Sequence, residues 1–122
     1  MAKTILIVDD SSSMRQVVGI TLRAAGYDVI EGRDGKDALN QLTGQKVHLI
    51  ISDVNMPNMD GISFVIAVKK MPAYKFTPII MLTTETEDAR KNEGRAAGAK
   101  AWVVKPFRPE QLLDAVQKLC LP

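Results

Sequence analysis

The segment ILIVDDSSSMR, residues 5–15, is the clearest indication of how this chain folds. Four apolar residues that favour strands run directly into two adjacent acids, Asp9 and Asp10, and a serine cluster able to start a helix follows at once. A strand followed immediately by a helix is the first half of a repeating strand and helix unit. The acid pair then stands at the carboxyl end of the strand, where parallel sheets place their ligand sites.

Apolar runs of strand length recur along the chain, and segments with helical spacing separate them. The runs are TILIV (4–8), YDVI (27–30), VHLII (47–51), PIIML (78–82) and AWVV (101–104). They are rich in Val and Ile and mostly lack alternating polar residues, as in strands that are covered on both faces. This alternation predicts an α/β fold with a parallel sheet, right-handed crossovers and helices on both faces.

The segments between the runs carry apolar side chains at helical spacing. The expected stripes are Met14, Val17, Val18, Thr21 and Leu22; Ala38, Leu39 and Leu42; Phe64, Val65 and Val68; and Leu112, Leu113, Val116 and Leu119. Residues 87–97 are mostly polar but are also expected to be helical. The tetrapeptide RAAG occurs at 23–26 and at 95–98, and its glycines, Gly26 and Gly98, are expected to end two helices in the left-handed conformation.

The composition predicts one soluble, cytoplasmic domain that spans residues 1–122. Apolar residues make up 46% of the chain and charged residues 25%, which is typical of a globular protein. The net charge is only +2, and the longest basic run is Lys69 and Lys70, which argues against nucleic acid as a partner. The apolar start of the chain is too short for a signal peptide or a membrane span. The single cysteine, Cys120, excludes an internal disulfide and is expected to pack in the core.

Polar side chains follow four of the expected strands and should meet at one edge of the sheet. The residues at these strand ends are Asp9 and Asp10, Ser52 and Asp53, Thr83 and Thr84, and Lys105, which Pro106 follows. Two carboxylates about 4 Å apart repel by roughly 4 kcal/mol at an effective dielectric constant near 20, so three in one crevice require a cation. Oxygen ligands without a neighbouring Cys or His favour a hard ion, and we expect Mg²⁺.

Each acid taken singly has a structural alternative. Asp9 or Asp10 could cap the helix that follows, as Ser11 to Ser13 also could, and Asp53 could cap the turn before the third helix. Capping does not explain why acids, a hydroxyl and a lysine share one edge, so the combination favours a functional site. His48 has no second His or Cys beside it, and we expect a structural role rather than metal binding.

The residue types suggest phosphoryl transfer to a carboxylate. A carboxylate can attack phosphorus when a metal ion and a fixed positive charge screen the incoming anion. Asp53 is the expected nucleophile, and Lys105 supplies the fixed charge. The Thr83 hydroxyl and the Thr84 backbone N–H can donate hydrogen bonds to the phosphoryl oxygens. The glycine-rich phosphate motifs GxxxxGK[ST] and GxGxxG are absent from the sequence, which argues against nucleotide binding.

The same residues resemble the receiver domain of two-component response regulators, in particular the stand-alone, CheY-like chemotaxis type. The resemblance runs from ILIVDD (5–10) through DVNMPNMDG (53–61) and MLTTE (81–85) to VVKPF (103–107). It implies a doubly wound, five-stranded parallel sheet in the order 2-1-3-4-5. The fold would be a flavodoxin-like, three-layer α/β/α sandwich with two helices on one face and three on the other. It also implies a single receiver domain over 1–122 with no output domain.

The resemblance assigns roles to individual residues. It implies that Asp53 is the phosphoacceptor, that Asp10 binds Mg²⁺ directly, and that Asp9 does so largely through water. The full set of implied metal ligands is Asp9, Asp10, Asp53 and the backbone carbonyl of Asn55. The residues implied to hold the phosphoryl group are Thr83, Thr84 and Lys105. The Lys105–Pro106 bond is expected to be cis, a conformation that is accessible before proline.

The implied function is a signalling switch rather than an enzyme that acts on free substrates. A partner histidine kinase would donate a phosphoryl group to Asp53, and Thr83 and Trp102 would then move. The expected output surface is the fourth helix, fifth strand and fifth helix, with a flagellar motor switch as target and a phosphatase as a further partner. Because the family usually has Tyr or Phe at the Trp102 position, the alternative of an exposed interface tryptophan stays open. We expect a monomer.

Three other functions are compatible with parts of this sequence. A stand-alone receiver can serve another pathway, as a phosphate sink, a relay intermediate or a regulator of surface motility. A Mg²⁺-dependent phosphatase with an aspartyl-phosphate intermediate, similar to haloacid dehalogenases, would need a DxD motif after the first strand, and the sequence lacks one there. A receiver that only binds partners would not need Asp10, Asp53, Thr83 and Lys105 together.

Overall fold

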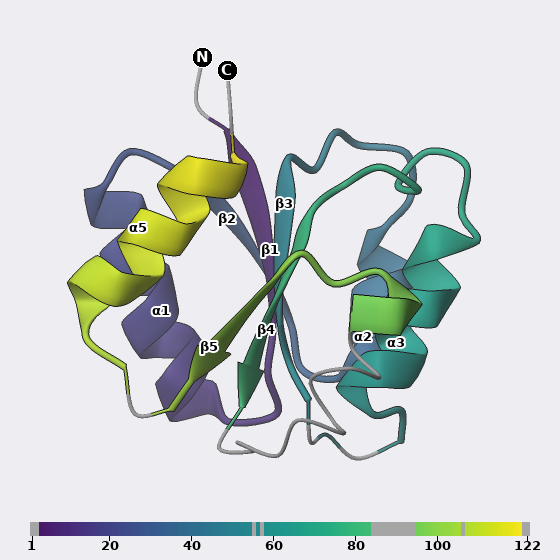
Figure 1. Cartoon of the computed structure of the whole chain (residues 1–122), viewed down its shortest axis with the longest axis horizontal. Helices are drawn as coiled ribbons and strands as arrows, with labels where there is room; N and C mark the ends of the chain where they lie inside the picture. Colours follow the sequence, from purple (N-terminus) through teal and green to yellow (C-terminus); the bar gives the residue numbers. More distant parts are fainter. Residues whose placement is uncertain (1–2, 55, 57, 84–94, 106, 121–122) are drawn as a thin grey trace.

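The computed structural model of the chain describes residues 3–54, 56, 58–83, 95–105 and 107–120, and structural statements concern these residues. Figure 1 shows a central sheet flanked by helices. The strands are β1 (Thr4–Val8), β2 (Asp28–Gly32), β3 (Leu49–Asp53), β4 (Ile79–Thr83) and β5 (Ala101–Val104). They form a five-stranded sheet in the order β2-β1-β3-β4-β5, and every neighbouring pair is parallel. The predicted topology is therefore confirmed.

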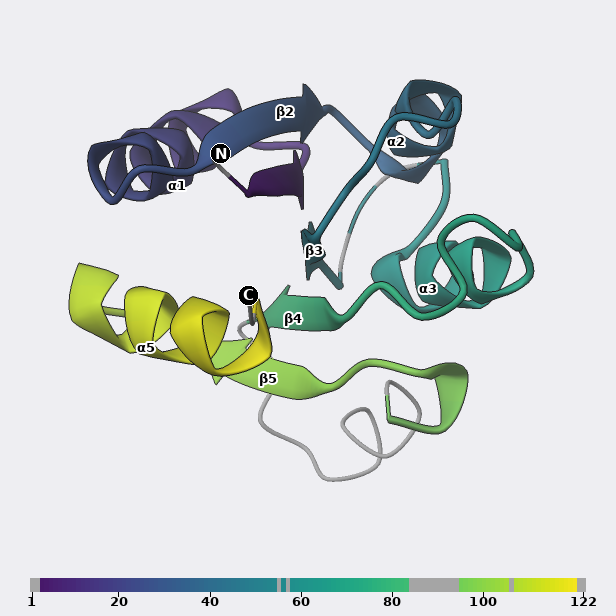
Figure 2. The same cartoon turned by 90° about the horizontal axis from the view of Figure 1, so that it is seen from above.

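Helices cover both faces of the sheet, as the view from above shows (Figure 2). On one face lie α1 (Ser12–Ala24) and α5 (Pro109–Leu119), and on the other lie α2 (Gly35–Gln41) and α3 (Gly61–Lys69). Residues 95–97 form a helical turn on the side of α3. The remainder of the helix expected at 87–97 lies outside the described residues. Within the described part of the chain, no helix is long and apolar enough to span a membrane.

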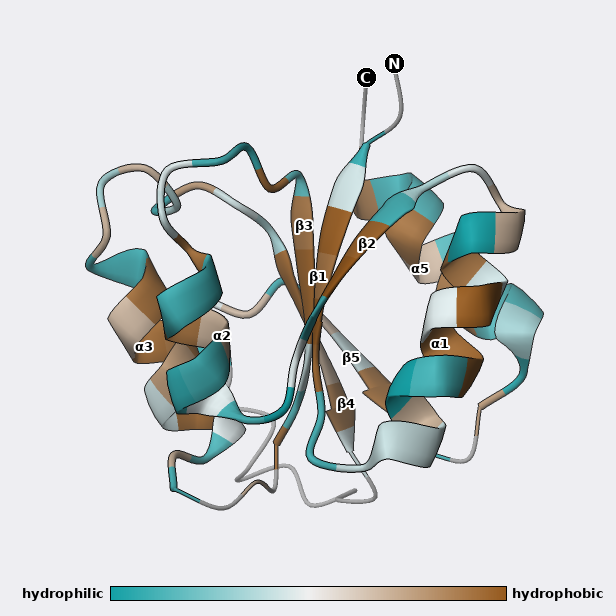
Figure 3. Ribbon diagram, turned by 180° about the vertical axis from the view of Figure 1, so that it is seen from behind, coloured by the Kyte–Doolittle hydropathy of each residue, from teal (hydrophilic) through white to brown (hydrophobic). Residues whose placement is uncertain are grey.

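The core has two halves, one on each face of the sheet. The three central strands are mainly apolar, and polar residues face outward on the helices (Figure 3). The half beneath α2 and α3 includes Leu6, Val8, Ile50, Phe64, Val65, Val68, Ile79 and Met81. The half beneath α1 and α5 includes Ile5, Ile7, Val18, Leu22, Ile51, Leu82, Leu112, Val116 and Cys120. The predicted packing role of Cys120 is confirmed, because this residue is buried within the second half.

One predicted core position is wrong. Val17 was expected in the buried stripe of the first helix, but 55% of its surface is exposed, whereas Val18 and Leu22 are fully buried. Successive residues of an α-helix are about 100° apart, so Val17 falls at the margin of a face centred on Val18. The apolar pattern of α1 is thus wider than the surface that the sheet covers.

The glycines of the repeated RAAG sequence adopt the expected conformation. Gly26 has φ +94° and Gly98 has φ +122°, both in the region that favours glycine. Each glycine N–H donates to the carbonyl of the arginine three residues earlier, Arg23 or Arg95, at 3.0 Å. The two copies therefore end their helical segments in the same way and return the chain to β2 and β5.

Two strands extend further toward their carboxyl ends than their apolar runs suggest. The runs at 27–30 and 47–51 predict strands that stop early, yet β2 reaches Gly32 and β3 reaches Asp53. The polar residues Ser52 and Asp53 pair with Met81 and Leu82 of β4, so backbone pairing continues beyond the apolar residues. As a result, Asp53 is held inside the sheet rather than on a loop.

Candidate functional site

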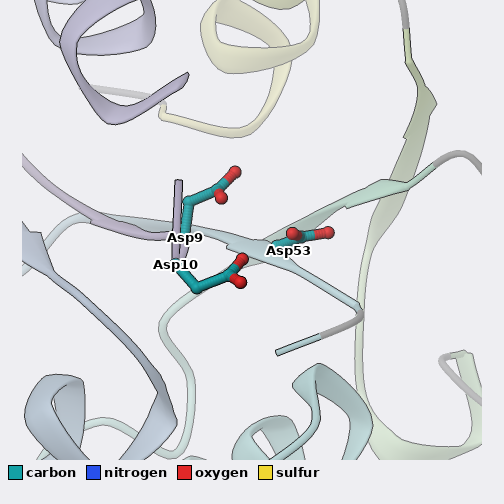
Figure 4. Close-up of side chains that lie close together, drawn as sticks. All are labelled: Asp9, Asp10 and Asp53. Atoms are coloured by element: carbon teal, nitrogen blue, oxygen red, sulfur yellow. The ribbon is translucent and has the colours of Figure 1, made fainter. Parts of the chain in front are cut away.

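Three carboxylates gather at the carboxyl ends of β1 and β3. Asp9 and Asp10 follow β1, Asp53 ends β3, and ligand oxygens of all three lie within 4.8 Å of one another. Figure 4 shows the three side chains gathered beside the strand ends. They meet because β1 and β3 are neighbours in register, with Val8 opposite Ser52. Asp9 is only 1% exposed and Asp53 only 7%, whereas Asp10 is exposed.

Lys105, which follows β5, provides positive charge to this site. Lys105 Nζ lies 3.3 Å from Asp9 Oδ2 and 3.4 Å from Asp53 Oδ2. The lysine is held in place from its backbone, whose N–H donates to the Thr83 carbonyl at 2.7 Å. Three carboxylates this close together require a cation, and the ammonium of Lys105 meets that need for Asp9 and Asp53. The exposed carboxylate of Asp10 is left to solvent or to a bound ion.

The environment of Asp53 disfavours its negative charge. Burial is the largest influence and raises the pKa of Asp53 above its ordinary value of 3.8, and the nearby charge of Asp9 raises it further. The ammonium of Lys105 acts in the opposite direction but does not cancel the effect. A divalent ion among these oxygens would favour the ionised form, which is the form that can act as a nucleophile.

Dedicated capping residues stand beside the acids, so capping does not account for Asp10 or Asp53. The N-cap of α1 is Ser11, whose hydroxyl accepts from the Met14 N–H at 3.2 Å. The N-cap of α3 is Asp60, whose carboxylate accepts from the Ser63 N–H at 2.8 Å. Asp9 retains a local structural role, because its Oδ1 accepts from the Ser11 N–H at 2.9 Å. Within the described part of the chain, Asp9 alone of the three acids therefore has a local structural role of the kind expected from a capping residue.

Gly61 allows the start of α3 to approach the backbone of Asp53. A Cβ at position 61 would lie 2.1 Å from the Asp53 carbonyl oxygen and 2.8 Å from Val54 Cα. The Gly61 N–H donates to the Val54 carbonyl at 2.7 Å, which closes the loop that follows β3. This close contact of two backbones leaves no room for a side chain, so the glycine helps to fix the end of β3.

Of the other predicted site residues, the structure describes Thr83 and Trp102. Thr83 is the last residue of β4 and is fully buried, with β3 as one neighbouring strand. Trp102 lies opposite Met81 and is half-buried against the core half beneath α2 and α3, so it is not a freely exposed side chain. The predictions for Asn55, Thr84 and the Lys105–Pro106 bond lie outside the described residues.

His48 has the structural role expected of it. Its Nδ1 accepts from the Thr4 N–H at 3.0 Å, and its own N–H donates to the Thr4 carbonyl at 2.8 Å. Both contacts join the start of β3 to the start of β1, at the end of the sheet opposite the carboxylates. Among the described residues, the one group suited to hold a metal ion consists of the three aspartates, and His48 is outside it.

Sequence reasoning missed one charged side chain at the site, that of Arg15. Its Nη1 donates to the Asp9 carbonyl at 2.6 Å, and its Nε lies 3.4 Å from Glu31 Oε1. The available signal was an arginine one turn into the helix that follows two acids. Position alone does not tell whether such a side chain points into solvent or folds back toward the strand.

The donor set fits Mg²⁺. Every candidate ligand atom is a carboxylate oxygen, and neither sulfur nor imidazole nitrogen belongs to the group. Hard divalent cations prefer such oxygens, and Mg²⁺ commonly uses one or two carboxylates together with water and a phosphate. The exposure of Asp10 leaves one side of the group open to solvent.

Comparisons with known proteins give a consistent picture. The family described as the response regulator receiver domain matches residues 5–117. Protein PilG of Pseudomonas aeruginosa is 34% identical over 113 residues, which are 93% of this chain and 84% of PilG. Chemotaxis protein CheY4 of Vibrio cholerae, crystallised at low pH, is 51% identical with a TM-score of 0.94 and covers 98% of this chain and 99% of its own.

A third similar protein was solved with a metal ion. The receiver domain of the sensor histidine kinase PA1611 from Pseudomonas aeruginosa has a magnesium ion coordinated in its active-site cleft. It is 27% identical to this chain, with a TM-score of 0.90, and the match covers 98% of each chain.

Proposed function

The chain belongs to the response regulator receiver family, and on that premise we propose that it is a phosphorylation-dependent switch that accepts a phosphoryl group on Asp53. The observation that carries the proposal is the contact of one lysine with two buried carboxylates, 3.3 Å from Asp9 and 3.4 Å from Asp53. A nucleophilic carboxylate, a fixed ammonium and an oxygen-rich metal site together are what phosphoryl transfer to aspartate requires.

The proposed reaction has two steps. A carboxylate oxygen of Asp53 attacks the phosphorus of a phosphohistidine on a partner kinase, so that a P–O bond forms and the P–N bond breaks. The departing histidine nitrogen keeps the electron pair and takes a proton from solvent. Water later attacks the same phosphorus, which releases inorganic phosphate and restores the carboxylate. The chain thus acts on its own phosphoryl group and is not an enzyme for free substrates.

Several residues of this chain support those steps. Lys105 would shift part of its contact from Asp53 to the phosphoryl oxygens, and the Thr83 hydroxyl would donate to them. Asp9, Asp10 and Asp53 would hold Mg²⁺, and Asn55 and Thr84 stay predictions for the metal and the phosphoryl group. When bound, Mg²⁺ supplies positive charge beside the reacting oxygens. The magnesium ion in the PA1611 receiver supports this choice of metal.

The signal would be a change of surface around β4 and β5. A phosphoryl group adds roughly 1.5 to 2 negative charges near pH 7. Those charges would attract the Thr83 hydroxyl, and the half-buried Trp102 would follow into the space that Thr83 leaves. Because the tryptophan is already packed against the core at one edge, a small rotation would alter the face formed by β5 and its neighbouring helices.

We place this switch in a two-component pathway in the cytoplasm, as a monomer. The phosphodonor would be a histidine kinase, a phosphatase would shorten the phosphorylated state, and the target would be a component of the flagellar motor switch. Similarity to CheY4 of Vibrio cholerae, a chemotaxis protein, supports chemotaxis as the pathway. The similarity to PilG leaves room for the other pathways of stand-alone receivers, namely a phosphate sink, a relay intermediate or surface motility.

Intact-mass spectrometry and Trp102 fluorescence test the proposal together. We expect acetyl phosphate with Mg²⁺ to add one phosphoryl group to the wild type and to change the fluorescence of the one tryptophan in the chain. The Asp53→Asn variant should show neither effect, although it should retain the fold. Equal labelling of the wild type and Asp53→Asn would show that Asp53 is not the acceptor. Rapid turnover of an aryl phosphate would favour a phosphatase instead.

A further inference from the structure

One arginine, Arg15, connects three elements of the fold through its contacts with the Asp9 carbonyl and Glu31. Arg15 lies in α1, and its side chain is only 14% exposed. Its Nη1 donates to the backbone carbonyl of Asp9 at 2.6 Å, while its Nε lies 3.4 Å from Glu31 Oε1 on β2. The register of the sheet places Glu31 beside Ile7, near the end of β1. A single planar guanidinium thus holds α1, β2 and the end of β1 together.

The orientation of the Asp9 carbonyl affects the backbone of the next residue, Asp10. It belongs to the same planar peptide unit as the Asp10 N–H, so fixing the carbonyl fixes the direction in which the chain enters Asp10. The preceding N–H of Asp9 donates to the Gly32 carbonyl at 3.1 Å, which fixes the other side of that residue. Both backbone groups of Asp9 therefore have defined partners, and Arg15 supplies the partner on the side of Asp10.

We propose that Arg15 is a positioning residue for the metal ligands Asp9 and Asp10. The proposal rests on the proposed function, because it concerns the same Mg²⁺ site. Arg15 acts through the peptide between the two acids and not through contact with the metal. Such outer contacts keep ligand oxygens in a geometry that Mg²⁺, with its strict octahedral preference, can use.

The sign of the effect separates positioning from simple electrostatics. Arg15 is a cation near an acidic site, so its charge alone opposes the binding of a second cation. Removal of that charge should strengthen Mg²⁺ binding if electrostatics dominates. Removal of the hydrogen bond to the Asp9 carbonyl should weaken Mg²⁺ binding if positioning dominates. Arg15→Met removes both, and the geometry predicts that the loss of positioning prevails.

The chain offers a matched control in Arg23. Its Nη2 lies 3.4 Å from Glu31 Oε2, so it contacts the other oxygen of the same glutamate, but its side chain is 52% exposed and lies two turns further along α1. Arg23→Met removes the same charge and one contact with Glu31. It leaves the contact between Arg15 and the Asp9 carbonyl in place.

Calorimetric Mg²⁺ titrations of four proteins test the inference at a temperature where all are folded. We expect Arg15→Met to bind Mg²⁺ about tenfold more weakly than the wild type, the lower end of the effect of outer-shell partners. Arg15→Lys should also bind more weakly, because an ammonium cannot make both contacts at once. Arg23→Met should stay within about twofold of the wild type. Unchanged or tighter binding by Arg15→Met would overturn the inference.

A second readout needs no metal. The backbone ¹⁵N chemical shift of Asp10 responds to the hydrogen bond on the preceding carbonyl, so Arg15→Met should move it in metal-free protein more than Arg23→Met does. An Asp10 signal unmoved in Arg15→Met would also overturn the inference. A wild type that binds no Mg²⁺ would instead refute the proposed metal site. If Arg15→Met fails to fold, Glu31→Gln takes its place, and weaker Mg²⁺ binding is expected there too.

Discussion

Lys105 Nζ lies 3.4 Å from Asp53 Oδ2, although Lys105 follows β5, which is two positions away from β3 in the sheet. The intervening strand, β4, ends at Thr83, whose carbonyl accepts from the Lys105 N–H at 2.7 Å. The same ammonium also contacts Asp9, so one cation offsets the charge of two buried acids. The ammonium thus partly offsets the burial and the Asp9 charge that disfavour the negative charge of Asp53 and raise its pKa.

Replacement of Lys105 by methionine should impair Asp53 in two ways. The pKa of Asp53 should rise further, because the ammonium is the largest of the influences that lower it. Phosphorylation by acetyl phosphate should slow by about 100-fold, the usual effect of losing one fixed donor to a transferring group. Carboxylate ¹³C NMR titration and the labelling rate measure the two effects. Lys118→Met, in a surface pair on α5, should change neither, and an unaltered labelling rate in Lys105→Met would refute this role.

Asp53→Asn should stabilise the metal-free protein near neutral pH. The pKa of Asp53 is raised above 3.8 by burial and by Asp9, so the folded protein binds a proton more readily than the unfolded chain. Wild-type stability should therefore rise as pH falls from the raised pKa toward 3.8, and the advantage of Asp53→Asn should shrink over the same interval. Urea unfolding without Mg²⁺ at several pH values measures this, and an advantage that grows on acidification would contradict it.

Gly61→Ala should destabilise the fold at the site itself. The new Cβ would lie 2.1 Å from the Asp53 carbonyl oxygen, so the loop after β3 must shift, at a cost of roughly 3 kcal/mol. The control is Gly19→Ala in α1, where the nearest atom is the movable end of the Arg23 side chain at 3.1 Å. That change should be neutral or stabilise by up to about 1 kcal/mol. Equal unfolding free energies for the two variants would refute the packing argument.

His48 should titrate below the ordinary histidine pKa of 6.5. Burial lowers the pKa most, followed by the charges of Lys3 and Lys46, and protonation would also remove the acceptor of the Thr4 N–H. The stability that neutral His48 provides is complete above pH 6.5 and is lost as pH falls through the pKa of the folded state. Imidazole NMR gives this pKa directly, since the chain has one histidine. Lys46→Met should move it back toward 6.5; a wild-type value above 6.5 would contradict the prediction.

The topology and the acid cluster could be predicted because they depend on short-range patterns. Apolar runs of strand length fix the order of elements, and parallel strands bring their carboxyl ends to one edge whatever their exact bounds. Asp9, Asp10 and Asp53 therefore meet even though β3 extends two residues beyond its apolar run. The positive φ of Gly26 and Gly98 was predictable for a similar reason, because a helix end that turns sharply favours glycine.

Contacts that depend on side-chain direction could not be predicted. The apolar pattern of α1 does not show that Val17 falls outside the surface that the sheet covers. The position of Lys105 predicts that it is near Asp53, but its simultaneous contact with Asp9 depends on how β5 is placed against β3. Arg15 folds back onto the Asp9 carbonyl because Glu31, distant in sequence, pairs with its guanidinium. The directions of these side chains follow from tertiary packing and not from local sequence.

Locating the phosphoryl group on the chain tests directly whether Asp53 is the acceptor. Protein treated with acetyl phosphate is reduced with borohydride, which converts an aspartyl phosphate to homoserine, and tandem mass spectrometry of its peptides finds the altered residue. We expect one altered residue, Asp53, in the presence of Mg²⁺ and much less alteration of it after chelation. Alteration at another aspartate, or equal labelling with and without Mg²⁺, would contradict this expectation.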